Sequence, residues 1–148
     1  MKSRGLSPIA RTIACILTLP IIVFGLYIII HGHLTPGGGF PGGAIMATLV
    51  ALFLVTFEDI ELERSLFSLL ESIALIAFIM IAFIGISNSF FHNFLANSQL
   101  IFGRSVSFGH NPGYLNSGGT VPLMNIAVGF EVFSAISIIL MLIKGDRE

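Results

Sequence analysis

The sequence predicts an all-α integral membrane protein whose single domain, residues 1–148, crosses the bilayer four times. Two observations lead to this fold class. First, 55% of the residues are hydrophobic and only 10% are charged, whereas a soluble domain carries about 25% charged residues. Second, the chain contains four apolar runs close to the length of about 20 residues that a transmembrane helix needs. These predicted spans cover residues 12–30, 40–57, 66–86 and 121–143.

The first predicted span follows a basic segment that contains Lys2, Arg4 and Arg11. A secretory signal peptide also begins with a basic segment before an apolar run. However, the run 12–30 holds 19 residues, more than the roughly 7–15 of a signal peptide, and no small-residue cleavage site closes it. We therefore expect this run to be retained as a membrane span.

The connection between the first two spans is rich in glycine and proline. The stretch HGHLTPGGGFPGG, His31–Gly43, contains six Gly and two Pro, which disfavours a regular helix or strand. Irregular backbone at membrane depth is tolerated only where protein or a water-filled cavity satisfies its polar groups. The stretch therefore indicates a partner surface or an aqueous path, or else a close-packed turn against neighbouring helices. The residues assigned to this structural loop are Pro36, Gly37, Gly38, Gly39, Phe40, Gly42 and Gly43.

The second span, 40–57, is the shortest, and its helix is expected to begin within the glycine loop. Free backbone N–H groups and the helix dipole favour a negative group at such a start. The loop lacks the lysine of a P-loop and the strand–turn–helix setting of a dinucleotide fold, so nucleotide binding is excluded.

The basic residues predict which side of the membrane each connection faces. Six of them flank the first, third or fourth span on one side, and one lies in the loop 87–120. The six are Lys2, Arg4, Arg11, Arg64, Lys144 and Arg147, and the other is Arg104. By the positive-inside rule, we expect a multi-pass cell-membrane protein with both termini and the loop 58–65 in the cytoplasm. The loop 87–120 is long for a bare connection, and we expect an interfacial helix near Phe90–Leu95.

Two acidic residues lie inside predicted spans. Glu131 is eleven residues into the fourth span, where a charge costs roughly 2.5–3.5 kcal/mol. It must therefore face a partner, a cavity or a proton, which fits a proton or cation relay or a carboxyl hydrogen-bonded at a subunit interface. Glu71 is six residues into the third span. It fits the cytoplasmic entrance of an ion path, or a side chain that snorkels to the interface.

Three further polar residues are candidates for the same ion path. Asn125 lies in the fourth span and fits a helix–helix hydrogen bond or an ion ligand. His31 and His33 adjoin the glycine loop on the outer side, and an imidazole suits proton exchange near neutral pH. Their alternative role is hydrogen bonding at a helix end. The spacing of the four histidines matches no ligand pattern, so we expect no metal site.

Several functional classes are disfavoured by composition. The single cysteine, Cys15, permits no internal disulfide and no cysteine-ligated iron–sulfur cluster. No histidine lies in the middle of a span where it could hold haem. A net charge of −1 argues against nucleic acid as a partner. We therefore expect no cofactor and no enzymatic activity in this chain.

Two stretches together resemble the MnhB/MrpB-like small subunits of the Mrp-type multisubunit Na⁺/H⁺ antiporters. They are HGHLTPGGGFPGG, His31–Gly43, and SGGTVPLMNIAVGFEV, Ser117–Val132. The family pattern commonly has Gln where this chain has Pro41 and Leu where it has Phe130, and neither difference affects an ionisable position. The resemblance implies a small subunit that works with other subunits of a membrane complex to exchange H⁺ and Na⁺. Similar subunits occur in membrane-bound hydrogenase and sulfur-reducing complexes of archaea, and the sequence does not choose between these assemblies.

Two hypotheses therefore remain open at the level of sequence. In the first, the polar residues line an ion path through the complex. In the second, the chain is a structural subunit that holds larger subunits together, as its small size suggests. A redox enzyme in its own right is disfavoured, and any redox chemistry is expected in partner subunits.

Overall fold

The computed structural model describes residues 6–57, 60, 62–84 and 120–145. In these residues the chain forms four α-helices and no strand. The helices are α1 (Pro8–His31), α2 (Gly39–Thr56), α3 (Arg64–Ile84) and α4 (Val121–Gly145). Each is long and apolar enough to cross a membrane. The predicted all-α fold with four spans is therefore confirmed.

The predicted limits are close to the observed ones except at the start of α1. This helix begins at Pro8 rather than at residue 12 because Ser7 caps it. The Ser7 hydroxyl accepts a hydrogen bond from the backbone N–H of Ala10 at 3.4 Å, and proline is well tolerated in a first helical turn. The predicted start was too late because the charged Arg11 ends the apolar run, although it lies inside the helix.

Some expectations fall on residues that the structure does not describe. The interfacial helix expected near Phe90–Leu95 and the rest of the loop up to residue 119 lie outside the described residues, as do residues 58–59 and 61 of the shorter connection.

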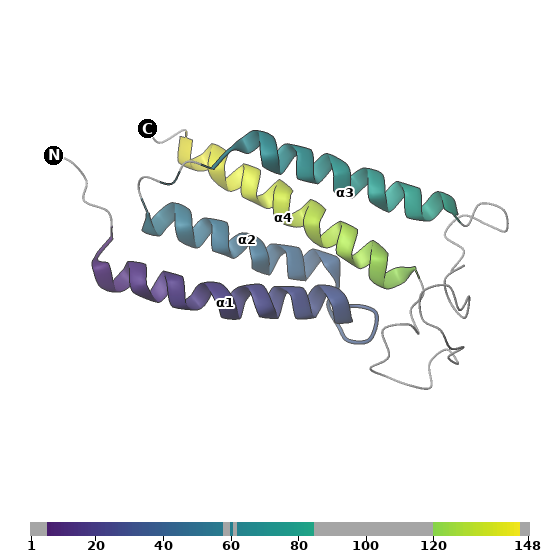
Figure 1. The fold of residues 1–148 in the computed structure, drawn as a ribbon, viewed down its shortest axis with the longest axis horizontal. Helices are drawn as coiled ribbons and strands as arrows, with labels where there is room; N and C mark the ends of the chain where they lie inside the picture. The colour runs from purple at the N-terminus through teal and green to yellow at the C-terminus, as the bar shows by residue number, and fades with distance from the viewer. Residues whose placement is uncertain (1–5, 58–59, 61, 85–119, 146–148) are drawn as a thin grey trace.

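The helices lie side by side in the order α1, α2, α4, α3 (Figure 1). Helix α4 packs against both α2 and α3, while α1 packs against α2 and makes a smaller contact with α4. Successive helices run in opposite directions, so the start of α1 and the end of α4 lie at one end of the bundle (Figure 1). We call this the terminal end. The opposite end, which holds the connection between α1 and α2, is called the turn end.

Glycines allow α2 to approach the backbones of both its neighbours. A Cβ atom added to Gly43 would lie 2.5 Å from the carbonyl oxygen of Gly129 in α4. A Cβ atom added to Gly42 would lie 2.8 Å from the carbonyl oxygen of Gly25 in α1. Small residues are the usual means of close helix packing in membranes, because lipid removes the hydrophobic drive between helices. These glycines therefore set the spacing of α1, α2 and α4.

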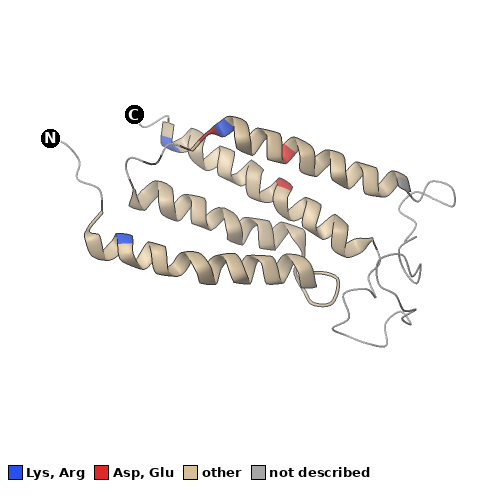
Figure 2. Ribbon diagram, viewed as in Figure 1, with Lys and Arg blue, Asp and Glu red and all other residues tan. Residues whose placement is uncertain are grey.

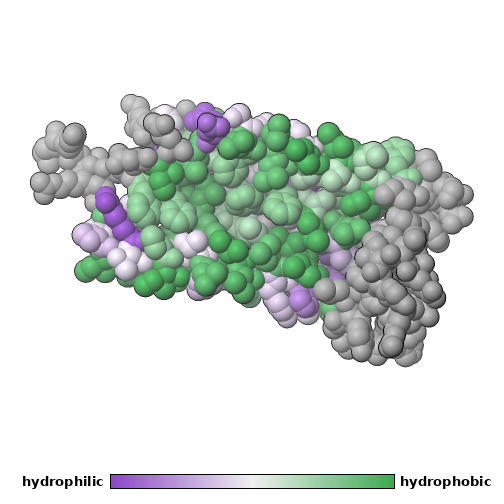
Figure 3. Space-filling model, in the orientation of Figure 1, coloured by the Kyte–Doolittle hydropathy of each residue, from purple (hydrophilic) through white to green (hydrophobic). Residues whose placement is uncertain are grey.

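The outside of the bundle is apolar, and its inside is built largely from small side chains. Figure 3 shows hydrophobic residues over most of the described surface on the face in view. Buried side chains include Ala47, Ala127, Ser134 and Ser137. The two serine hydroxyls donate to carbonyl oxygens four residues earlier, at 2.8 and 2.6 Å. These buried hydroxyls thus have hydrogen-bond partners, which polar groups inside a membrane require.

We expect Gly43→Leu to destabilise the bundle by roughly 1–3 kcal/mol or more, the range for overpacking. The new side chain would push against the backbone of α4 at Gly129. The measurement is thermal unfolding of the purified complex in detergent. Val55→Leu is the control on the same helix, since Val55 is 70% exposed. A Gly43→Leu protein as stable as this control would contradict the close contact.

Candidate functional site

The glycine- and proline-rich stretch is irregular only over residues 32–38. His31 ends α1 and Gly39 begins α2. Gly37 and Gly38 have φ angles of 145° and 121°, a region that residues with a side chain rarely adopt. Glycine is therefore required at the point where the chain turns back into the membrane.

Four residues assigned to the structural loop lie in a helix instead. Gly39, Phe40, Gly42 and Gly43 form the first turns of α2, in agreement with the prediction that this helix begins within the glycine loop. Pro41 lies among them without penalty, because the first N–H groups of a helix have no intrahelical partner to lose. The glycines in these turns allow neighbouring helices to approach closely, and they are not needed for an unusual backbone conformation.

Asn125 of α4 lies against the inside of the turn. A Cβ atom added to Gly32 would lie 2.9 Å from its Nδ2 atom, and one added to Gly38 would lie 3.4 Å from its Oδ1 atom. The Nδ2 atom is buried and has no hydrogen-bond partner among the described residues, and the same holds for both ring nitrogens of His33. Buried polar atoms are normally paired, so the turn end keeps three polar atoms with unused hydrogen-bonding capacity.

His31 differs from His33 because it has partners within α1. Its ring stacks on Tyr27 with centroids 4.3 Å apart, and its Nδ1 atom lies 3.2 Å from the carbonyl oxygen of Tyr27. The hydroxyl of Thr35 donates to the carbonyl oxygen of His31 at 3.1 Å. His31 is thus engaged in ending α1.

The contact between α3 and α4 fixes which of their residues lie level. The rings of Phe67 and Phe133 pack with centroids 5.7 Å apart. Three residues further along α3 and three residues back along α4, Leu70 and Phe130 line one shared pocket. The helices therefore run antiparallel, and Leu70 lies at about the height of Phe130.

This register brings Glu71 and Glu131 to the same depth and the same side. Glu71 follows Leu70 and Glu131 follows Phe130, and each step along a helix rises about 1.5 Å and turns about 100°. Because the helices are antiparallel, the heights of Glu71 and Glu131 along the bundle differ by about 3 Å. The rotation of about 100° from Leu70 to Glu71 and from Phe130 to Glu131 brings both glutamates to the same side of the contact between α3 and α4. Both residues are half-buried, and the red stretches of α3 and α4 in Figure 2 lie at matching levels. We call this side of the α3–α4 seam the acidic flank.

The other helices lie on the opposite side of α4. Gly129 precedes Phe130 and therefore turns away from Glu131; a Cβ atom added to it would lie 2.7 Å from the Cδ1 atom of Ile29 in α1. Helix α2 approaches the same side of α4 through Gly43. Neither α1 nor α2 therefore covers the acidic flank.

Neither glutamate has a partner in the described part of the chain, whether a hydrogen bond or an ion pair. The basic residues described there are Arg11, Arg64 and Lys144, and the blue stretches of Figure 2 lie toward the terminal end. Arg64 donates from Nη2 to the carbonyl oxygen of Met141 at 3.2 Å. Among the residues that the structure describes, no Lys or Arg therefore lies at the depth of the two glutamates.

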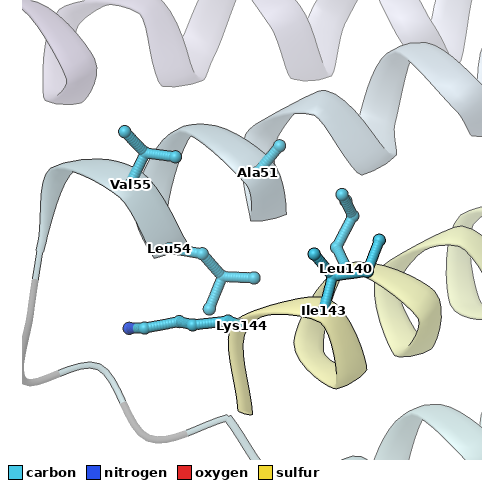
Figure 4. Close-up of a pocket in the computed structure, with 6 residues that line it drawn as sticks. All are labelled: Ala51, Leu54, Val55, Leu140, Ile143 and Lys144. Carbon is cyan, nitrogen blue, oxygen red and sulfur yellow. The ribbon is translucent and has the colours of Figure 1, made fainter. Parts of the chain in front are cut away.

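A pocket of about 350 Å³ lies between α2 and α4 near the terminal end. Figure 4 shows its lining, in which the Lys144 side chain runs beside Leu54. The lining residues are Ala51, Leu54, Val55, Leu140, Ile143 and Lys144. Apart from Lys144 the lining is apolar and offers no acidic side chain to a cation, so this pocket is no candidate for the ion path. Within the described ranges there is also no group of three acidic, histidine or cysteine side chains that could hold a metal.

The five candidate residues fall into two separate places. Asn125, His31 and His33 lie at the turn end, and Glu71 and Glu131 lie on the acidic flank, on another side of α4. The sequence left Glu71 with two roles, the cytoplasmic entrance of an ion path or a side chain that snorkels to the interface, and it did not predict that Glu71 is level with Glu131. The missing information was the α3–α4 register, which depends on contacts between the helices such as that of Phe67 with Phe133.

Comparison with known proteins connects this geometry to a family. Residues 9–138 match a domain related to the MnhB subunit of Na⁺/H⁺ antiporters. A protein named as antiporter subunit mnhB2 in Staphylococcus haemolyticus is 28% identical over 143 residues, which cover 95% of this chain and 96% of that protein. An uncharacterized protein of Methanocaldococcus jannaschii is 26% identical over 147 residues, covering 95% of this chain and 53% of the other. The chain thus spans about half the length of this second relative.

A solved structure has the same fold. It is that of the membrane-bound sulfane sulfur reductase (MBS), an archaeal respiratory membrane complex, and one of its chains is 33% identical with a TM-score of 0.76. The match covers 96% of this chain and 60% of that chain. The resemblance expected from the two sequence stretches is therefore confirmed. The chain belongs to the family of domains related to the MnhB subunit of Na⁺/H⁺ antiporters.

Proposed function

We propose that this chain is a small membrane subunit of a multisubunit cation/proton antiporter, and that Glu131 lies on its ion path with Glu71. The observation that carries the proposal is the pair of half-buried carboxyls at one depth with no partner among the described residues. A charge at such a depth costs about 2.5–3.5 kcal/mol. Each carboxyl therefore needs a proton, a cation or another subunit, and membership of an antiporter family favours ion exchange.

The chain acts with other subunits, which supply the rest of the path for Na⁺ and H⁺. The four described helices form a row that leaves the acidic flank open on one side, so these helices alone do not enclose a path. The 33% identity to a chain of a respiratory complex supports a second setting, an antiporter module within a respiratory assembly. In that setting redox chemistry belongs to partner subunits, because a chain with one cysteine provides no cysteine-ligated cluster.

A purely structural role is the competing function. Its support comes from the glycine contacts of α2 and from the broad apolar surface (Figure 3), both of which suit assembly. The two functions make different predictions for Glu131. In a structural subunit Glu131 serves only to bind neighbouring subunits, whereas on an ion path it is needed for ion exchange.

We also propose that the terminal end faces the cytoplasm. The described basic residues, Arg11, Arg64 and Lys144, belong to helix ends or turns at that end, as the positive-inside rule requires of a cytoplasmic surface. The turn end, with Asn125 and His33, then serves the outer mouth of the path. Their unused buried polar atoms support a role in which water or an ion is bound transiently.

Glu131→Gln is expected to reduce ion exchange at least about tenfold, equivalent to about 1.4 kcal/mol in the barrier, while the complex still assembles. Gln keeps the size of the side chain but carries neither charge nor exchangeable acid proton. The measurement is ²²Na⁺ and pH-gradient exchange in vesicles that hold the complete complex, with assembly checked on a native gel. Glu63→Gln is the control, because Glu63 is exposed just before α3. Exchange at the control rate would assign the chain a structural role.

Asn125→Leu is expected to leave assembly intact and to slow exchange several-fold. Replacing a buried polar group that lacks a partner by an apolar one of similar size is nearly neutral for folding, so a loss of exchange would report on the path. The same vesicle assay applies. If assembly falls instead, Asn125 stabilises the turn through contacts with Gly32 and Gly38, and its place on the path is wrong.

Cysteine labelling checks the orientation. In a Cys15→Ala background, Ser7→Cys at the terminal end should react with a membrane-impermeant maleimide only from the cytoplasmic side. Thr35→Cys at the turn end should react only from outside, since both positions are exposed. The reverse pattern, measured in intact cells and inverted vesicles, would overturn the proposed topology.

A further inference from the structure

The acidic flank is a membrane-facing surface that hydrocarbon does not suit. Glu71 lies seven residues after the start of α3, and Glu131 lies ten residues after the start of α4. At 1.5 Å per residue these are about 10 and 15 Å from the nearer helix end, too deep for a short acidic side chain to reach water easily. Acidic residues inside membrane spans almost always face protein or a water-filled cavity. The flank must therefore be covered.

The described part of this chain does not supply the cover. Helices α1 and α2 lie on the opposite side of α4, where Gly129 contacts Ile29. The one described basic side chain on α3, Arg64, lies two turns before Glu71 and donates to the carbonyl oxygen of Met141. His31 and His33 lie at the turn end. A positive charge that balances these carboxyls is therefore not supplied by the residues that the structure describes.

We infer that the acidic flank docks a transmembrane helix of another subunit, and that this helix presents a lysine or arginine between Glu71 and Glu131. The two carboxyls lie on the same side of one seam, and their heights differ by about 3 Å. One cationic side chain between them could therefore interact with two negative charges. The occupant at this depth is a helix because irregular backbone exposed to lipid is not tolerated there. The inference deepens the proposed function and rests on its multisubunit complex. It concerns the subunit that binds beside the glutamates, not the ion that is transported.

The test places a photo-crosslinking amino acid on either side of α3 in the complete complex. Leu75 lies one turn beyond Glu71 and is 45% exposed, whereas Leu69 lies about 3 Å before Glu71 along the helix axis and about 200° around it, and is 60% exposed. Crosslinked peptides are identified by mass spectrometry. We expect the Leu75 position to capture one transmembrane segment of another subunit with a Lys or Arg within one turn of the crosslink, and the Leu69 position not to capture that segment.

Three results would overturn the inference. They are capture of lipid alone at position 75, capture of residues 85–119 of this chain, and capture of a segment without a basic residue.

A second measurement tests the charge itself. In the double variant Glu71→Gln, Glu131→Gln, the partner's cation would be buried without a counter-charge, which is strongly destabilising. We expect recovery of the captured subunit with this chain to fall at least about tenfold relative to the Glu63→Gln control, and to return when the partner's basic residue is also replaced by Met. Unchanged recovery in the double variant would contradict the ion pair.

The outcomes separate this inference from the proposed function. If position 75 captures a basic segment while Glu131→Gln still exchanges ions at the control rate, the docking stands and the place of Glu131 on the path is wrong. If Glu131→Gln stops exchange while position 75 captures only lipid, the path stands and the docking is wrong.

Discussion

The close approach of α2 to its two neighbours is the contact on which the rest of the structure depends. Gly42 admits the backbone of α1 and Gly43 admits the backbone of α4, so three helices are held by contacts that no larger residue would allow. In a membrane this matters more than in water, because the apolar side chains gain little by leaving lipid for one another. Packing at the glycines decides where the helices lie.

The same contact determines the direction of Glu131. Gly129 faces inward, against Ile29, and this fixes the rotation of α4 about its own axis. The next residue, Phe130, then faces the seam with α3, and Glu131 lies on the side that α1 and α2 leave uncovered. A glycine with no chemistry of its own thus sets the position of the carboxyl on which the proposed function rests.

The sequence allowed the fold to be predicted much better than the site. Each span is long and apolar, so the four helices could be recognised from composition alone; only the cap at Ser7 and Pro8 moved a boundary appreciably. The rotation of each helix was harder, because lipid-facing and protein-facing residues in a membrane are both apolar. That is why the cost of burying Glu131 could be predicted from the sequence, whereas the matching depth of Glu71 and Glu131 could not. The pairing depends on the contact between Phe67 and Phe133, which joins residues far apart in the sequence.

The separation of the polar residues on α4 limits how any ion can cross the complex. Asn125 lies on the side of α4 that meets the turn, against Gly32 and Gly38, while Glu131 lies about 120° around the helix on the acidic flank. The pocket between α3 and α4 has an apolar lining, and the buried hydroxyls of Ser134 and Ser137 already donate to their own helix. An ion path through this bundle would have to pass these apolar side chains. A path along its outside needs only a neighbouring subunit against the acidic flank, and this is the arrangement that a row of four helices with its acids on one side favours.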